Sequence, residues 1–293
     1  MRIGLQIPSF TWPGGAAAIG PTLGKIAQTA DDAGFATIWC MDHFFQIQHV
    51  GPPSDPMLEG YSALAYMAAL TKRARLGLMV TGVIYRYPGV LVKTVTTLDV
   101  LSGGRAILGI GAAWNEVESR GLGIPFPSVK VRFEMLAEAL EIAHLMFSDN
   151  TAPYYGKHYQ LGEPMNHPLP LSQPHPPILI GGGGEQKTLR LVAKYGDACN
   201  LFGRMGPEVL RHKLDVLKGH CDDLGRPYEE IEKTALDTVQ VGADGQSPAD
   251  VIAHCRALAD LGFQQVIFNM PNVSDITPLE TFGKEIIPAV AEF

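Results

Sequence analysis

The sequence has few of the features that mark several large classes of protein. Only four of its 293 residues are cysteines, and they lie far apart with no CxxC pair: Cys40, Cys199, Cys221 and Cys255. This spacing disfavours a disulfide framework or a cysteine-based zinc site and predicts a reduced, cytoplasmic protein. No apolar run approaches the roughly 20 residues of a membrane-spanning helix, and Pro8 interrupts the first apolar segment. We therefore expect neither a membrane anchor nor a signal peptide.

Positive charge and metal-binding patterns are also scarce. The chain has 23 Lys and Arg residues against 30 Asp and Glu, a formal net charge of −7. This balance disfavours a nucleic-acid-binding surface and favours an enzyme that acts on a small organic molecule. There is no HExxH motif and no tight cluster of His, Cys and carboxylate residues, so no metal site is expected. A GxSxG motif is absent too, which removes the commonest type of serine hydrolase.

One pattern recurs along the chain: an amphipathic stretch, a glycine and a short apolar run. It occurs at Gly34, Gly104, Gly196 and Gly262, where the glycine could end a helix in the left-handed conformation and the apolar run would be a buried strand. The first two glycines lie about 70 residues apart and the last two about 66, or roughly two strand–helix units each. Eight such units predict a single (β/α)8 TIM-barrel domain over residues 1–293, with an open, doubly wound sheet as the alternative.

The predicted elements alternate along the whole chain. Strands are expected at residues 2–8, 36–41, 75–81, 106–111, 177–181, 198–202, 235–241 and 265–270. Helices are expected at about 21–33, 60–72, 88–101, 129–147, 186–195, 207–224, 248–261 and 278–290. The remaining length falls in residues 148–176, which are rich in proline and have no helical period. We expect this segment to be an insertion over the barrel mouth.

Barrel enzymes build their sites at the carboxyl ends of the strands, and a glycine-rich segment stands at one of these ends. In IGGGGEQKT, residues 180–188, four glycines follow a strand and open a helix. Their bare N–H groups could hold a phosphate at the helix N-terminus, although a tight strand-to-helix turn without a ligand would also use them. The segment is not a P-loop, because the final Gly-Lys-Ser/Thr is absent.

Other strand ends carry candidates whose roles the residue types alone leave open. His43, in MDHFF, could transfer a proton with Asp42 orienting it, or could simply pack. The two glycines of LGIGAAWNE, residues 108–116, could let a flat ligand approach the backbone or could relieve crowding inside the barrel. Trp114 replaces the third glycine that a dinucleotide motif would have there. Arg86 could bind an anionic ligand or hold a loop in place.

Taken together, MDHFF, VTGVIYRYP, LGIGAAWNE, GKHYQL and IGGGGEQKT resemble the bacterial luciferase-like superfamily, most closely its coenzyme F420-dependent oxidoreductase branch. The similarity runs from the first strand to about residue 202. It implies a barrel with a deazaflavin or flavin lying across its carboxyl face, a homodimer, and a non-proline cis peptide at Met79-Val80 behind the ring.

The resemblance also implies roles for individual residues. His43 matches the histidine beside the reactive ring carbon and is the expected catalytic residue, while Phe44 and Trp114 would form the substrate pocket. The positions expected to bind the cofactor are Asp42, Met79, Val80, Thr81, Gly111, Asn115, Gly182, Gly183 and Gly184, the last three as a phosphate cradle. The sugar-phosphate dehydrogenases of the family carry a carboxylate in a longer glycine loop before their Asn-Glu pair. Here that loop is only GAAW, and Glu116 belongs to the pair, so glucose 6-phosphate is not the expected substrate.

The expected function is hydride transfer between coenzyme F420 and a small organic substrate. One alternative is an oxygen-using monooxygenase that works with reduced FMN, and another is a protein that binds the cofactor without turnover. An aldolase or isomerase would need a lysine or paired carboxylates at the strand ends, and the predicted strand ends have neither.

Overall fold

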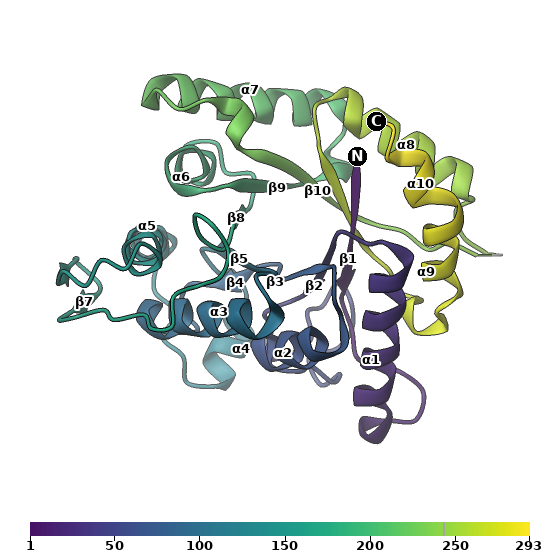
Figure 1. The fold of residues 1–293 in the computed structure, drawn as a ribbon, viewed down its shortest axis with the longest axis horizontal. Coiled ribbons are helices and arrows are strands. Elements are labelled where there is room, and N and C mark those ends of the chain that lie inside the picture. The colour runs from purple at the N-terminus through teal and green to yellow at the C-terminus, as the bar shows by residue number, and fades with distance from the viewer. Residues whose placement is uncertain (243) are drawn as a thin grey trace.

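The computed structural model describes residues 1–242 and 244–293, and eight parallel strands at its centre close into a barrel (Figure 1). In chain order they are β1 (Arg2–Ile7), β2 (Thr37–Cys40), β3 (Arg75–Leu78), β5 (Ala106–Gly111), β8 (Ile178–Gly181), β9 (Ala198–Phe202), β10 (Glu232–Thr238) and β11 (Gln265–Asn269). Each strand pairs with its sequence neighbours, and β11 pairs with β1 to close the ring. The predicted TIM barrel is confirmed, and the open-sheet alternative is wrong.

Helices surround the barrel in the predicted order. They are α1 (Ala16–Ala33), α2 (Gly60–Leu70), α3 (Pro88–Ser102), α4 (Glu116–Gly121), α5 (Val129–Phe147), α6 (Thr188–Tyr195), α7 (Pro207–Leu224), α8 (Pro248–Asp260), α9 (Thr277–Thr281) and α10 (Ile287–Val290). Gly34 ends α1 in the left-handed conformation, with φ of 92°. Gly196 after α6 is instead extended, with φ of −87° and ψ of 145°, so the predicted left-handed cap is wrong there. None of the described helices is long and apolar enough to cross a membrane.

Several predicted boundaries differ from the structure. The helix expected from residue 21 begins at Ala16, because Pro21 lies inside α1 and not at its start. The third strand ends at Leu78, and a two-residue strand, β4 (Thr81–Gly82), continues its edge after Met79-Val80. The last predicted helix, residues 278–290, is divided by a π-helical turn over Phe282–Ile286. The six-residue helix α4 was not predicted at all, since it is too short to show a helical period.

Large side chains fill the inside of the barrel, and the neighbouring inward positions are therefore occupied by glycine. Trp39, Ile107 and Leu236 belong to this inner cluster. A Cβ at Gly77 would lie 2.5 Å from Trp39, and one at Gly109 would lie 1.9 Å from the carbonyl oxygen of Leu78. Gly109 is therefore glycine because of crowding within the barrel, which was one of the two readings that the sequence left open.

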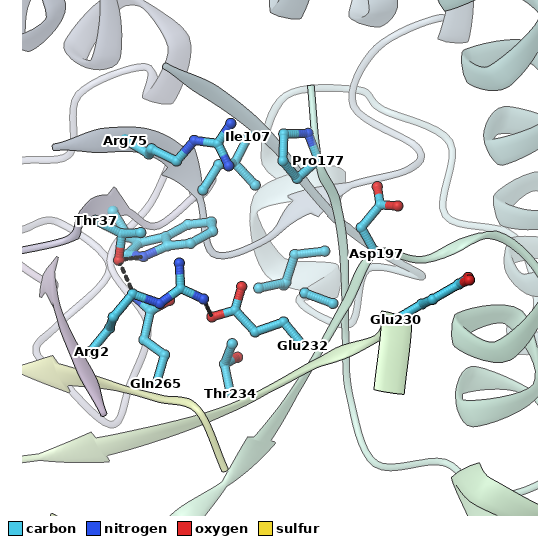
Figure 2. A pocket seen from close by; sticks show the side chains of 13 residues that line it. Arg2, Thr37, Arg75, Ile107, Pro177, Asp197, Glu230, Glu232, Thr234 and Gln265 are labelled. Atoms are coloured by element: carbon cyan, nitrogen blue, oxygen red, sulfur yellow. Dashed lines mark hydrogen bonds and ion pairs between the residues drawn. The ribbon is translucent and has the colours of Figure 1, made fainter. Parts of the chain in front are cut away.

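A small cavity of about 210 Å³ lies at the amino-terminal end of the barrel (Figure 2). Its polar side chains come from the first residues of the strands, and Arg2 forms an ion pair with Glu232 at 2.7 Å. Gln265 donates a hydrogen bond to Thr37 there. Residues at this end of a TIM barrel generally serve stability, because catalytic loops follow the carboxyl ends.

Residues 148–176 lie against the outer surfaces of two helices. Glu138 of α5 accepts hydrogen bonds from the backbone N–H groups of residues 157–159, beside a short hairpin made by β6 (Tyr154–Tyr155) and β7 (Gln160–Leu161). Asp99 of α3 accepts hydrogen bonds from the backbone of Leu171 and Ser172. No residue of the segment is among those that line the cavity at the carboxyl end. Its predicted position over the mouth stays a prediction.

Candidate active site

A cavity of about 330 Å³ opens at the carboxyl ends of the strands. Its walls come from residues that follow β2, β3, β5 and β8 and from residues within β5, β8, β9 and β10, together with the first turns of α5 and α6. Its volume lies at the lower end of the range for ligand pockets, about 300–1,000 Å³. Seven of the predicted site residues line it: Asp42, His43, Met79, Val80, Gly111, Trp114 and Gly182.

Val80 forms one wall of this cavity and explains two glycines. The peptide bond Met79-Val80 is cis, as predicted. A Cβ at Gly111 would lie 2.8 Å from Val80 Cγ2, and one at Gly181 would lie 2.8 Å from Val80 Cγ1. These strand ends are glycines because the side chain of Val80 occupies the space between them, and the valine then presents an apolar surface to the cavity.

His43 is held by a carboxylate that the sequence analysis missed. Its Nδ1 lies 2.6 Å from Oε1 of Glu118, whose side chain is fully buried. The same carboxylate accepts hydrogen bonds from Tyr85 Oη at 2.6 Å and from the backbone N–H groups of Phe44, at 2.6 Å, and Phe45, at 3.3 Å. Glu118 lies 75 residues after His43, on a helix that no pattern predicted, so no spacing could have linked the two.

The electrostatics of this cluster keep Glu118 ionised. Burial alone would raise the pKa of the Glu118 carboxyl, but the hydrogen bonds from His43 and Tyr85 outweigh it and lower the pKa below its usual value. Burial and the neighbouring Glu118 raise the pKa of Tyr85. The tyrosine hydroxyl therefore stays protonated and donates a hydrogen bond to the carboxylate. With Nδ1 of His43 donating to Glu118, Nε2 is the ring atom left to exchange a proton with a molecule in the cavity. The ring of Trp114 stands edge-on to the imidazole, with 5.4 Å between centroids.

Asp42 lines the cavity, but both its oxygens are already engaged. Arg86 donates to Oδ2 through Nη1 at 2.7 Å and to Oδ1 through Nη2 at 3.0 Å. Arg86 also donates to Glu59 and lies over the ring of Tyr61, 4.8 Å from its centroid. Burial raises the pKa of Asp42, and the hydrogen bonds from Arg86 act in the opposite direction. Arg86 therefore holds a loop in place, the second of the two roles the sequence left open.

Three other predicted site residues lie behind the cavity wall. Thr81 is fully buried, and its hydroxyl lies 2.9 Å from that of Tyr61. The side chain of Asn115 caps α4 by accepting a hydrogen bond from Val117 N. Phe44 packs against Tyr85, with ring centroids 5.2 Å apart. These contacts support the walls, and the predicted direct roles of the three residues stay predictions.

The glycine-rich loop borders the cavity and is open to solvent. Gly182 adopts φ of +118°, a conformation that favours glycine, and its N–H donates to the carbonyl of Asn200. Among residues 1–242 and 244–293, no protein acceptor is found for the N–H groups of Gly183 and Gly184, and no side chain caps α6. Free backbone N–H groups in a loop that leads into a helix, as these lead into α6 at Thr188, fit an anion such as phosphate. Gly183 and Gly184 are not among the residues that line the cavity, but they directly follow Gly182, which is.

The described residues contain no group of three His, Cys, Asp or Glu side chains that could hold a metal ion.

The chain is similar to a known protein family and to several known proteins. The family model described as luciferase-like monooxygenase matches residues 1–269. The F420-dependent glucose-6-phosphate dehydrogenase of Kineococcus radiotolerans is 27% identical over 274 residues, which cover 90% of this chain and 78% of that protein. An uncharacterized protein of Mycobacterium tuberculosis is 32% identical over 275 residues, covering 87% of this chain and 89% of its own.

Solved structures share the fold at low identity. The coenzyme F420-dependent tetrahydromethanopterin reductase of Methanopyrus kandleri superposes with a TM-score of 0.80 at 17% identity, covering 98% of this chain and 99% of that one. The oxygenating constituent of 3,6-diketocamphane monooxygenase of Pseudomonas putida, in complex with FMN, gives a TM-score of 0.77 at 18% identity, with 98% of each chain covered.

Proposed function

Because this chain belongs to the luciferase-like monooxygenase family, we propose that it is an oxidoreductase that transfers a hydride between coenzyme F420 and a small organic substrate. Support for the cofactor comes from relatives named as F420-dependent dehydrogenases that match most of the chain. The observation that carries the chemistry is His43, which lines the cavity while Glu118 engages its Nδ1.

The residues divide the work between binding and proton transfer. When bound, coenzyme F420 would supply the two-electron hydride chemistry at its ring. The free N–H groups of Gly183 and Gly184 would hold its phosphate, and Val80 would support one face of the ring. His43 would take up, at Nε2, the proton that the substrate releases in the oxidation direction, and would return it in the reverse direction. Trp114 and the neighbouring apolar side chains would exclude water.

The decisive experiment compares the two cofactors on the purified protein. Absorbance or fluorescence titrations with F420 and with FMN measure their dissociation constants, and we expect F420 to bind and FMN to bind far more weakly. Tight binding of FMN without binding of F420 would favour the monooxygenase alternative. Binding of F420 without hydride exchange in a broad panel of small organic compounds would favour a binding protein without turnover.

His43→Ala tests the proposed proton transfer. We expect turnover to fall by about 10²–10⁴-fold, because general acid–base catalysis contributes about that much. The dissociation constant of F420 should stay within about threefold, since His43 does not hold the tail. His49→Ala, at an exposed histidine outside the cavity lining, is the matched control. Full turnover in the His43 variant would remove this residue from the mechanism.

Two further expectations concern assembly and substrate. We propose a cytoplasmic homodimer, in which the exposed apolar residues Tyr87, Val90 and Leu101 along α3 form part of the interface. Light scattering on the purified protein tests the stoichiometry. The short loop between Gly111 and Asn115 has no carboxylate, so we propose that the substrate is a compound other than glucose 6-phosphate.

A further inference from the structure

A second groove, of about 450 Å³, lies outside the barrel between α5 and α6. These two helices are neighbours in the helical layer (Figure 1). The floor of the groove is apolar and includes Phe133, Ala137 and Leu191. Phe133 also lines the active-site cavity, and Lys187, the N-cap residue of α6, lies three residues after the last glycine of the glycine-rich loop. The groove therefore begins where the tail of a ligand held by that loop would leave the cavity.

The rim of the groove carries positive charge without a partner. Lys130, Lys187 and Arg190 line it, and none of the three forms an ion pair within the described part of the chain. The ammonium of Lys187 lies over the ring of Phe133, 5.3 Å from its centroid, which places the charge above the apolar floor. The protein as a whole has a formal net charge of −7, so three such cations along one groove form a positive region on an acidic protein.

The two carboxylates in the groove, Glu134 and Glu141, offset part of this charge, and each also has partners outside the three cations. Glu134 already accepts hydrogen bonds from Lys157 Nζ and His158 Nε2, both at 2.8 Å. Glu141 accepts hydrogen bonds from two tyrosine hydroxyls and lies 3.8 Å from Lys194. The groove lining therefore has four cationic side chains, Lys130, Lys187, Arg190 and Lys194, against these two carboxylates, and its net charge is positive.

On the other side of the glycine-rich loop, Lys213 and His212 of α7 both approach the carboxylate of Glu185, which offsets their charge. Arg204, which follows β9, lies over the ring of the cavity residue Phe202, 4.9 Å from its centroid. The groove along α5 and α6 differs in that three cations without an ion pair among the described residues line it together.

We propose that this groove binds the distal, polyanionic part of the cofactor, the oligoglutamate chain beyond its phosphate. The inference rests on the proposed function, since it concerns the tail of coenzyme F420. The cavity of about 330 Å³ would hold the ring, the loop would hold the phosphate, and the carboxylates would follow the groove. From Lys187 to Lys194, α6 rises by about 10 Å, enough for about two to three extended residues.

The test compares three deazaflavin compounds on two triple variants. The compounds are F420 with several glutamates, a form that ends at the phosphate, and a form that lacks both phosphate and glutamates. The groove variant is Lys130→Gln/Lys187→Gln/Arg190→Gln. The matched control neutralises three exposed lysines outside the groove, Lys25→Gln/Lys72→Gln/Lys218→Gln. Thermal unfolding of both variants confirms that they fold.

We expect the groove variant to bind long-tailed F420 on the order of tenfold more weakly at low salt, because each exposed ion pair contributes modestly and three are lost. The phosphate-terminated form should bind within about twofold of the unmodified protein, and added salt should reduce the difference. Equal losses for both forms, or no loss for the long-tailed form, would overturn the proposal. If no deazaflavin binds the unmodified protein, the proposed function itself fails, and this inference with it.

Discussion

Replacing Glu118 with glutamine tests the arrangement of the proposed active site most directly. The carboxylate serves donors on both oxygens: His43 Nδ1 and Tyr85 Oη on Oε1, and two backbone N–H groups on Oε2. The backbone donors cannot turn away, so the glutamine oxygen should face them and its NH2 group should face His43. In the favoured tautomer Nδ1 then accepts a hydrogen bond and the ring proton is on Nε2, so His43 can act as a base at Nε2 only from the disfavoured tautomer.

The size of the effect follows from the bond that is lost. A hydrogen bond to a charged group contributes about 1.5–3 kcal/mol, so kcat/KM should fall by about 10- to 100-fold. The dissociation constant of F420 should change by less than about threefold, because Glu118 is buried behind His43. In addition, the acidic limb of the pH profile of kcat/KM should change, because Glu118 titrates with a lowered pKa and the glutamine has no carboxyl group to titrate.

Two variants control for a purely structural effect. Glu116→Gln changes a half-exposed carboxylate on the same helix, which pairs with Arg120 at 2.8 Å, and should leave kcat/KM and its pH profile unchanged. Tyr85→Phe removes one donor to Glu118 but leaves the bond to His43, so we expect a loss below about fivefold. Unchanged turnover and an unchanged pH profile in Glu118→Gln would refute the reasoning. So would a loss of F420 binding as large as the loss of turnover.

Two further substitutions test the loop and the scaffold. Gly182→Ala places a methyl group at φ of +118°, at a cost of about 1–3 kcal/mol, and should weaken binding of F420 more than binding of the form without phosphate. Gly225→Ala, at the left-handed end of α7, is its control in the same titration. The second substitution is at Asp31, in α1. Burial alone would raise the pKa of the Asp31 carboxyl, but hydrogen bonds from the N–H groups of residues 72–74 outweigh it and lower the pKa below its usual value. Its contribution to stability is therefore present above about pH 4 and lost as the pH falls through the lowered pKa. In urea unfolding, Asp31→Asn should lower the free energy of unfolding by about 1–3 kcal/mol at pH 7 and by less at pH 3, and an equal loss at both pH values would contradict this account.

The sequence by itself determined the barrel and the end of the barrel where the site lies. Helix-ending glycines and short apolar runs are local features, because they depend on backbone conformation and on which face of a segment is buried. Their regular spacing was enough to count eight units and to place His43, Trp114 and Gly182 at strand ends. All parallel strands of a barrel end at the same rim, so the residues that follow them surround one cavity. In the structure His43, Trp114 and Gly182 all line that cavity.

Only the tertiary structure decided how those residues are held. Glu118 reaches His43 across 75 residues, and Arg86 reaches Asp42 across 44. Gly111 and Gly181 are glycines because of the side chain of Val80, which lies in the link between β3 and β4. Residues 148–176 follow α3 and α5 because the carboxylates of Asp99 and Glu138 accept their backbone N–H groups. Such contacts depend on the tilt and register of neighbouring strands in the closed barrel, and no pattern along the chain records which side chains will then point at one another.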